Sequence, residues 1–264
     1  MKKQKGFRIE KLYLDCIDDR GNSFIIYWAK AEIFLIKFVY SGLIFCNEAG
    51  LTIEKSALKR IKKPLTEGTI NFNNNFLKTE VTLERIDNSI YIPLYKKNEN
   101  KVLIWNCHHP KALAKIIFNG NLYKGFGYAE TLFSTIKPWN LPIDELRWGR
   151  FLSDSCTLIW ISWKGKYPIN KIFYNGKEYI DAIIGDDNIN FGDGSFKLKF
   201  SDIKLVRKGR LSSLFSKMPL LKLIINRRIL NSTEIKYKAK TTFCKNSVFQ
   251  SNGWSLYEIV IWGK

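Results

Sequence analysis

The sequence has few of the residues from which metal centres and disulfide frameworks are built. Its two histidines, His108 and His109, are adjacent. Adjacent residues on a strand point to opposite faces, so these two cannot easily share one metal ion. The five cysteines are far apart and none has CxxC spacing, which predicts reduced, mostly buried thiols. They are Cys16, Cys46, Cys107, Cys156 and Cys244. We expect no metal site and no disulfide.

Apolar runs long enough to cross a bilayer are also missing. The first residues, "MKKQKGFRIEK", form a basic cluster with no apolar segment behind it, so no secretory signal is apparent. The longest apolar stretch, residues 33–46, is interrupted by Lys37 and is too short for a transmembrane helix. We expect a soluble, cytoplasmic protein.

Motifs for binding nucleotides, calcium and nucleic acid are absent or incomplete. "NGNLYKGFG" (119–127) is rich in glycine, but no convincing helix follows it, which argues against a phosphate-binding loop. "GDDNINFGDGS" (185–195) lacks the terminal Glu and the spacing of a calcium loop, which favours a hairpin. No nucleophile elbow, helix-turn-helix, zinc finger or RNP signature occurs. We expect no cofactor, and nucleic acid is not a favoured partner.

Positive charge is present in large excess. Lys and Arg number 43 against 24 Asp and Glu, and the net charge of +19 attracts polyanions whatever the fold. The lysines are spread along the whole chain, which favours a lysine-coated surface; peripheral contact with an anionic membrane is the alternative. Segment 209–230 combines apolar and basic residues, but Pro219 divides it. We therefore predict strand plus loop there rather than an amphipathic membrane-surface element.

Aromatic residues are abundant and suit pleated sheets, with 18 Phe, 12 Tyr and 8 Trp. Short apolar runs alternate with polar turns along the chain, and persuasive helical periodicity is scarce. Near the start, Leu12 and Leu14 would share one face of a strand and Tyr13 the other. "NG" at 175–176 and "GDG" at 192–194 are hairpin signals. The pattern predicts an all-β protein.

Two pairs of segments repeat between the halves of the chain. "GNSFIIYWAK" (21–30) resembles "SCTLIWISWKG" (155–165), and "GNLYKGFGYAE" (120–130) is echoed by "SNGWSLYE" (251–258). Two antiparallel β-barrels in tandem explain this repeat, because closing each sheet also protects its edges.

A mixture of aromatic, basic and acidic residues lies where the halves join, in "GYAETLFSTIKPWNLPIDELRWGRF" (127–151). We place one barrel at residues 1–135 and the other at 136–264. With "EKLYLDCIDDRGNSFIIYW", "HPKALAKIIFNGNLYKGFGYAE" and "GWSLYEIVIWGK", this stretch resembles the lipocalin-like hydroxyneurosporene synthase family, also called carotenoid 1,2-hydratases, and related Diels–Alderase-type tandem barrels. The resemblance implies two linked calycin-like barrels and a buried apolar ligand site.

The middle motif of that family reads Gly-Tyr-x-Asp, and Gly127, Tyr128 and Glu130 match it with Glu in the place of Asp. The family often has histidines beside the carboxylate. Here Ala129 and Thr131 stand in those places, so the resemblance does not identify a carotenoid hydratase.

A second piece of the family motif, Trp-Gly-Arg, matches residues 148–150. Burial would raise the pKa of Glu130 and keep it protonated as a general acid for a C=C bond, and aromatic faces would stabilise the resulting carbocation. For a pericyclic reaction, the pocket would instead fold a polyene while a Tyr or Arg polarises a carbonyl. The candidate catalytic residues are Glu130, Tyr128 and Arg150. The candidate ligand-binding residues are Trp139, Trp148, Arg147, Tyr257 and Glu258. The expected partner is a hydrophobic small molecule: a polyene, an isoprenoid or a polyketide-like compound.

A structural interpretation competes with this one. Glu130 would pair with Arg147 or Arg150, which would lower its pKa. Trp148 and Arg150 would close one end of a barrel, and "PWNLP" (138–142) would be a stiff connector.

The second half repeats the pairing of a tyrosine with a carboxylate as Tyr257 and Glu258, which favours a structural role for at least one copy. The chain would then be a non-catalytic carrier of a hydrophobic ligand. A basic module for anionic lipid or nucleic acid is a further alternative. The sequence does not set the oligomeric state.

Overall fold

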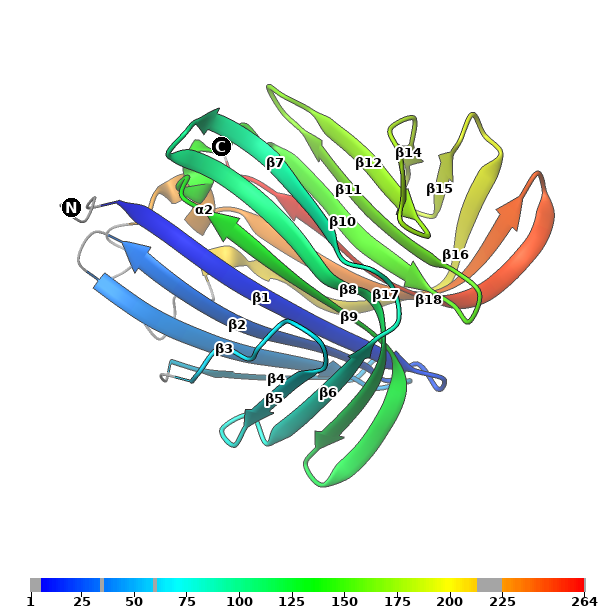
Figure 1. The fold of residues 1–264 in the computed structure, drawn as a ribbon, viewed down its shortest axis with the longest axis horizontal. Helices are drawn as coiled ribbons and strands as arrows, with labels where there is room; N and C mark the ends of the chain where they lie inside the picture. Colours follow the sequence, from blue (N-terminus) through cyan, green and yellow to red (C-terminus); the bar gives the residue numbers. More distant parts are fainter. Residues whose placement is uncertain (1–5, 34–35, 59–60, 213–224, 264) are drawn as a thin grey trace. The chain divides into compact units, whose positions relative to one another are not determined.

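The computed structural model describes residues 6–33, 36–58, 61–212 and 225–263. The chain divides into two compact units, Met1–Lys137 and Pro138–Lys264. Within the described residues, each unit is a curled antiparallel sheet of nine strands (Figure 1). The prediction of an all-β protein with two antiparallel sheets in tandem is confirmed.

The sheet of unit 1 has the strand order β4-β3-β2-β1-β9-β8-β6-β5, and β7 also pairs with β8. Its strands are β1 (Phe7–Asp18), β2 (Ser23–Ile33), β3 (Ile36–Cys46), β4 (Thr52–Ala57), β5 (Ile70–Asn74), β6 (Thr79–Arg85), β7 (Ile90–Asn98), β8 (Lys101–Phe118) and β9 (Asn121–Ser134).

The sheet of unit 2 has the order β13-β12-β11-β10-β18-β17-β16-β15-β14. Its elements are η1 (Pro138–Asn140), β10 (Glu145–Leu152), β11 (Thr157–Lys164), β12 (Ile169–Tyr174), β13 (Lys177–Tyr179), β14 (Ile183–Ile184), β15 (Asn188–Phe191), β16 (Phe196–Arg210), α2 (Arg227–Leu230), β17 (Thr233–Lys245) and β18 (Val248–Ile261).

The predicted hairpins are confirmed. Asn175 and Gly176 join β12 to β13 with φ of 47° and 82°, the left-handed pair that a tight hairpin turn requires. Gly192, Asp193 and Gly194 join β15 to β16, also with positive φ. Short left-handed residues at these points let consecutive strands pair directly.

The inner face of unit 1 is a contiguous hydrophobic core. Strands β1, β2, β3, β5, β6, β8 and β9 all contribute buried side chains to it. Part of this core is aromatic: the centroid of the Phe24 ring lies 4.8 Å from that of Phe45 and 4.8 Å from that of Tyr123. These side chains form the close-packed inner core of unit 1.

Strands β4 and β5 are the two ends of the strand order in unit 1, and no backbone pairing joins these two described strands. Side chains form hydrogen bonds across the gap between these two ends. Asn74 on β5 donates a hydrogen bond to Ser41 Oγ on β3 at 3.1 Å, and both residues are buried. Lys55 on β4 donates to Asn119 Oδ1 at 3.0 Å, in the turn between β8 and β9. The described strands therefore curl without a backbone ladder between β4 and β5, and polar side chains bridge the gap.

The inner face of unit 2 is more aromatic. Phe200 stacks on Tyr257 with ring centroids 5.0 Å apart and on Trp160 at 5.9 Å, and Tyr237 stacks on Tyr257 at 5.3 Å. Such offset ring contacts stabilise a core beyond the area that they bury.

The two units repeat the same strand order, which confirms the repeat seen in the sequence. Strands β1–β4 correspond to β10–β13, and β9 and β8 correspond to β18 and β17. Gly125 and Gly253 occupy equivalent points: a Cβ there would lie 2.1 Å from the Ile17 oxygen and 2.2 Å from the Leu152 oxygen, respectively. Glycine is therefore needed in both halves, because β9 and β18 lie too close to the backbone of β1 and β10 at these points for a side chain to fit.

Segment 209–230 departs in part from its prediction. Strand β16 runs to Arg210 and residues 213–224 lie outside the described residues, but 227–230 form the one-turn helix α2 instead of strand or loop. Asn226 caps this helix, because its side chain accepts a hydrogen bond from Arg228 N. In the described part of the chain, no helix has the length and apolarity needed to cross a membrane.

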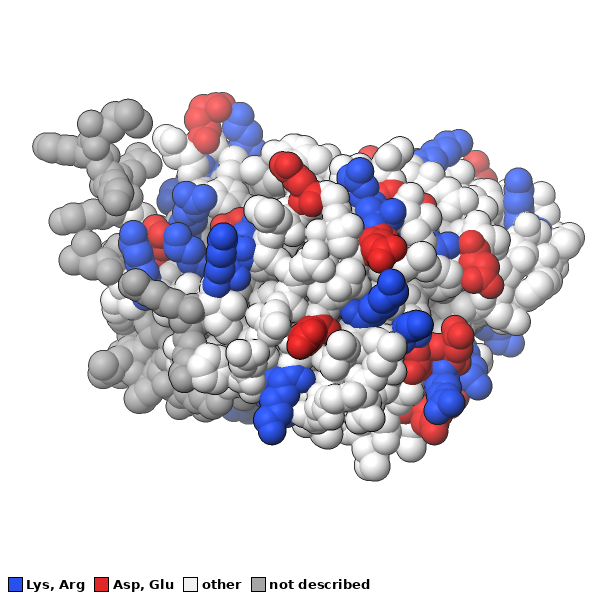
Figure 2. Space-filling model, turned by 60° about the horizontal axis from the view of Figure 1, so that its bottom comes forward, with Lys and Arg blue, Asp and Glu red and all other residues white. Residues whose placement is uncertain are grey.

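The charges on the surface are mixed in sign. On the face drawn in Figure 2, Lys and Arg side chains are interspersed with Asp and Glu. Exposed ion pairs such as Lys115–Glu84, at 3.4 Å, neutralise part of the basic excess locally. Four of the cysteines are buried and Cys244 is half-buried, and all five are free thiols in the structure.

Candidate active site

Glu130 lies on β9 and faces away from the core of unit 1. Its neighbour Ala129 belongs to the inner core, and residues on a strand alternate between faces. Tyr128 and Glu130 therefore share the opposite face, where Glu130 is paired with Tyr13 on β1 and with Cys107 on β8. The family motif thus places its tyrosine and its carboxylate side by side.

Two neutral donors hold one oxygen of this carboxyl group. The Tyr128 hydroxyl donates a hydrogen bond to Glu130 Oε2 at 2.6 Å, and the Trp105 indole N–H donates to the same oxygen. Trp105 and Tyr128 are almost completely buried, and Glu130 is 8% exposed. When the group is protonated, an Oε2 that already accepts two hydrogen bonds leaves Oε1 as the oxygen that carries the proton.

Burial raises the pKa of Glu130. The hydrogen bonds from Tyr128 and Trp105 and the charge of Lys11 oppose this shift but do not cancel it. Burial also raises the pKa of Tyr128 well above its usual range, so the phenol stays a neutral donor. The upward direction at Glu130 is the one that a general acid requires and the reverse of the effect of an ion pair.

Aromatic rings line the same face beside Glu130. The Tyr13 ring contacts Tyr27 edge-on at 5.5 Å and Tyr128 at 6.1 Å, between centroids. The Lys11 ammonium lies over the Tyr27 ring at 5.0 Å. The contact between Lys11 and Tyr27 is a cation–π interaction, so an aromatic ring on this face already holds a positive charge.

Gly127 of the motif is required by close packing on the inner face. A Cβ at this position would lie 2.8 Å from the Asp15 oxygen, 2.8 Å from a Leu83 methyl and 2.9 Å from the Ala114 methyl. The glycine lets three strands approach one another directly behind the Tyr128–Glu130 pair.

The Trp-Gly-Arg piece divides between the two faces of β10. Trp148 and Arg150 point away from the inner core, and both are buried. Arg150 Nη1 donates to the Trp254 carbonyl on β18 at 3.1 Å. Gly149 faces inward, and a Cβ there would lie 2.3 Å from the Trp160 ring, so the indole occupies the space that a side chain would need.

Arg147 and Tyr257 lie on the inner side of unit 2. Arg147 forms ion pairs with Glu145 at 2.7 Å and with Asp186 at 2.6 Å. Burial disfavours its charge, but these two carboxylates outweigh that effect and raise the pKa of Arg147. Tyr257 belongs to the aromatic core, where burial raises its pKa.

Glu258 lies on the opposite face from Tyr257, because the two are consecutive on β18. Its carboxylate forms an ion pair with the buried Lys236 on β17, which also contacts Glu234 at 3.1 Å. Glu234 in turn pairs with Arg207 on β16. The tyrosine and the carboxylate of the second half are therefore separated, unlike Tyr128 and Glu130.

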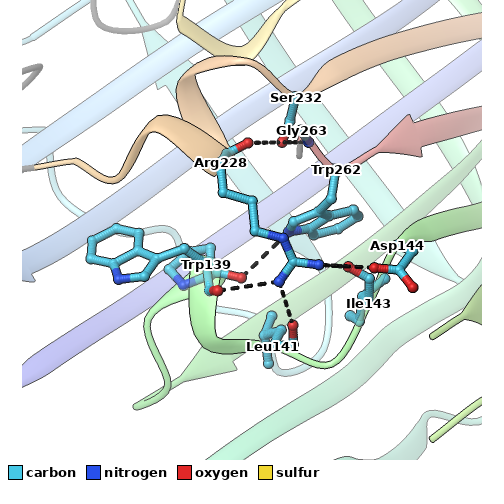
Figure 3. Close-up of polar contacts among 9 residues, drawn as sticks. Trp139, Leu141, Ile143, Asp144, Arg228, Ser232, Trp262 and Gly263 are labelled. Atoms are coloured by element: carbon cyan, nitrogen blue, oxygen red, sulfur yellow. Dashed lines mark hydrogen bonds and ion pairs between the residues drawn. The ribbon is translucent and has the colours of Figure 1, made fainter. Parts of the chain in front are cut away.

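Trp139 lies in η1, in the segment that the sequence identified as a connector. The Arg228 guanidinium of α2 donates to the carbonyls of Trp139, Leu141 and Ile143 at 3.2, 3.1 and 2.7 Å (Figure 3). The Trp139 indole points away from the guanidinium. Trp139 thus contributes its backbone carbonyl to the Arg228 hydrogen bonds, which hold segment 139–143 against α2.

Comparison with known proteins finds likeness in the fold but not in the sequence. No family model matches the chain, and no curated protein does. Kievitone hydratase from Nectria haematococca superimposes with a TM-score of 0.57 at 9% identity, over 97% of this chain and 89% of that one. CghA gives 0.58 at 8% identity over 98% and 89%, and CghA with Sch210972 gives 0.56 at 8% over 97% and 89%.

The chain has a tandem-barrel, lipocalin-like fold. The fold expected from the motifs is thereby confirmed. At 8–9% identity this likeness extends to the scaffold alone, and the chemistry of this lipocalin-like chain has to be argued from its own side chains.

Trp105 and Cys107 are the site residues that sequence reasoning missed. They lie on β8 with the same alternation as any half-buried strand, in "KVLIWNC" (101–107). Only the register of β8 against β9 shows that Cys107 is opposite Glu130 and that the Trp105 indole reaches its carboxyl group. In this lipocalin-like fold, β8 of unit 1 and β17 of unit 2 occupy equivalent places, next to β9 and β18. The repeat between the halves was therefore the one sequence signal for the strand that carries Trp105 and Cys107.

The adjacent histidines have separate partners. His108 Nε2 lies 2.8 Å from Thr131 Oγ1, and His109 Nε2 lies 2.7 Å from the Gly68 carbonyl oxygen. Burial lowers the pKa of His108 to about 4. Among the residues that the structure describes, no three His, Cys, Asp or Glu side chains gather as a metal site.

Proposed function

We propose that this chain is a lipocalin-like hydratase or cyclase that protonates an unsaturated, hydrophobic small molecule, with Glu130 as the general acid. The observation that supports it most directly is the buried Glu130 carboxyl, whose hydrogen-bond partners are the neutral donors Tyr128 and Trp105. A carboxyl group in such surroundings retains its proton to higher pH than an exposed one.

The proposed step uses the proton on Oε1 of Glu130. The O–H bond breaks, a C–H bond forms at one carbon of a C=C bond, and the positive charge is left on the other carbon. Tyr13 and Tyr128 offer aromatic faces that stabilise this cation by about 0.5–2 kcal/mol each. In a hydratase, water adds to the cation and its surplus proton returns to the Glu130 carboxylate. In a cyclase, a second C=C bond of the ligand attacks the cation instead, and the new cation that forms loses a proton to the Glu130 carboxylate.

The scaffold supports a small-molecule function. One structure with this fold is a hydratase by name, and another holds Sch210972. We propose a polyene, an isoprenoid or a polyketide-like molecule as the ligand of this chain. The free thiols fit a reducing compartment, so we place the reaction in the cytoplasm.

The test of the acid is Glu130→Gln. The amide keeps the shape of the carboxyl group and accepts the bonds from Tyr128 and Trp105, but it has no acidic proton. The ligand is first identified by native mass spectrometry of the full chain purified from its own host. We expect the variant to bind that ligand within about threefold of the wild-type Kd and to lose at least 100-fold in kcat, within the usual range for general acid catalysis.

Glu84→Gln is the matched control, because Glu84 is an exposed carboxylate of the same unit and pairs only with Lys115 among its described ion partners. It should leave turnover unchanged. Full turnover by the Glu130→Gln variant would contradict the acid role. A wild-type protein that binds the ligand and never converts it would instead identify a carrier.

A further inference from the structure

The two units have a carboxyl group at the same place in the fold. Glu130 on β9 is opposite Tyr13 on β1, and Glu258 on β18 is opposite Trp148 on β10. These strands are equivalent in the two sheets, and both carboxyls point away from the inner core of their unit. Comparing Glu130 with Glu258 therefore shows how different surroundings affect the protonation of a carboxyl group at the same place in the fold.

The residue that faces the carboxyl from the other neighbouring strand differs in charge. In unit 1 it is Cys107 on β8, and in unit 2 it is Lys236 on β17. Burial raises the pKa of the Cys107 thiol well above its usual range, so this residue stays neutral. Lys236 is 1% exposed and forms an ion pair with Glu258.

The remaining neighbours of the two carboxyl groups also differ. The Tyr128 position of unit 1 corresponds to Leu256, and the Trp105 position corresponds to Glu234. The titratable and charged groups around Glu130 are Tyr13, Lys11 and Asp15 on β1, Cys107 on β8 and Tyr128 on β9. Those around Glu258 are Lys236, Lys238 and Glu234 on β17, Arg150 on β10 and, through Glu234, Arg207 on β16. Arg150 occupies the place that Asp15 has in unit 1, so the charge at this position also differs between the units.

We infer that the residue opposite the carboxyl group, Cys107 in unit 1 and Lys236 in unit 2, decides which unit has a proton-donating carboxyl, so that Glu130 retains a proton and Glu258 is a fixed anion. A buried carboxylate next to a buried ammonium stays charged, because losing either charge leaves the other unpaired at a large cost. Acid chemistry is thereby restricted to unit 1. The catalytic use of this proton rests on the proposed function, but the protonation states do not.

Infrared spectroscopy of the full chain with ¹³C-labelled glutamate tests this inference. A protonated carboxyl group has a C=O stretch that a carboxylate lacks. Spectra of the wild type, Glu130→Gln and Glu258→Gln are compared as the pH is raised. We expect the band of a protonated carboxyl that persists to the highest pH to vanish in Glu130→Gln, and Glu258→Gln to remove carboxylate bands only. A persistent protonated band that Glu258→Gln removes would overturn the inference.

The exchange of the facing residue tests the cause. Lys236→Cys places the unit 1 residue in unit 2, and we expect it to create a new protonated-carboxyl band that Lys236→Cys with Glu258→Gln abolishes. Lys236→Met, which keeps more of the side-chain volume, serves if Lys236→Cys does not fold. A Glu258 that stays ionised without Lys236 would overturn the inference. If the spectra agree and no turnover is found, the proposed function fails while this inference stands.

Discussion

A buried carboxyl group keeps or loses its proton according to the groups that face it. At Glu130, the two hydrogen-bond donors are neutral and meet at one oxygen, Oε2. Tyr128 and Glu130 could be proposed from the sequence, because they lie in one short motif. Trp105 could not be proposed in this way, because its contact depends on how β8 aligns with β9 and not on any spacing along the chain.

Trp105→Phe removes one donor to Glu130 and keeps an aromatic ring in place. Hydrogen bonds to a carboxylate favour its charged form, so their loss raises the pKa of Glu130 further. We expect Glu130 to stay protonated to higher pH than in the wild type, and the alkaline limb of a pH–rate profile to move in the same direction. Titration of ¹³C-labelled glutamate by NMR measures the shift.

Trp28→Phe is the control for this experiment. The Trp28 indole donates to the Ile61 carbonyl at 2.9 Å and belongs to the inner core of the same unit. It should leave the titration of Glu130 where it was. An unchanged or lowered pKa in the Trp105 variant would show that the indole does not stabilise the carboxylate.

Strand β8 determines which residues meet Glu130. Its first half pairs with β7 and its second half with β6, and its register against β9 shifts twice between Cys107 and Ala112. Pro110 lies within this irregular stretch, where the missing N–H costs no ladder bond to β9. The sequence predicts such strands from alternation, but it does not reveal a change of partner within one strand.

The hydrogen bonds from Arg228 of α2 to segment 139–143 are a second feature that could not be predicted from the sequence. Their acceptors are backbone carbonyls far away along the chain. Arg228→Met removes the donor to Trp139, Leu141 and Ile143 and keeps much of the side chain. We expect the free energy of unfolding to fall by about 2 kcal/mol, since carbonyls that lose a charged donor are left unsatisfied. Denaturant unfolding of the full chain measures this.

Arg227→Met provides the comparison, because Arg227 is the exposed neighbour on the same short helix. Its substitution should change the free energy of unfolding by less than about 0.5 kcal/mol. Equal effects of the two substitutions would mean that the guanidinium contacts of Arg228 contribute nothing of their own.

For the whole molecule, the sequence predicted the fold well because its signals are local. Alternation, "NG" at 175–176 and "GDG" at 192–194 mark strands and hairpins within a few residues. The repeat between the halves indicated two similar sheets in tandem, but the order of strands in each sheet is known only from the structure. Segment 209–230 was harder, because its apolar residues fit a strand as well as the helix α2 that forms at 227–230.

The net charge of +19 leads to a prediction for anionic membranes. Basic and acidic side chains are interspersed on the face drawn in Figure 2, so we expect attraction to a charged bilayer to come from the overall field of the protein. We expect sedimentation with phosphatidylserine vesicles at low salt and its loss at about 0.15 M salt, where charges are screened beyond about 8 Å. Neutral phosphatidylcholine vesicles are the control, and binding that survives this salt would indicate a dedicated lipid site.

The pinning of Oε2 by Tyr128 and Trp105 has a stereochemical consequence. A carboxyl group that cannot rotate delivers hydrogen from one fixed direction, so a molecule held beside it is attacked on a single side. The new carbon centre would then form with one handedness. A racemic outcome would mean that the group turns freely.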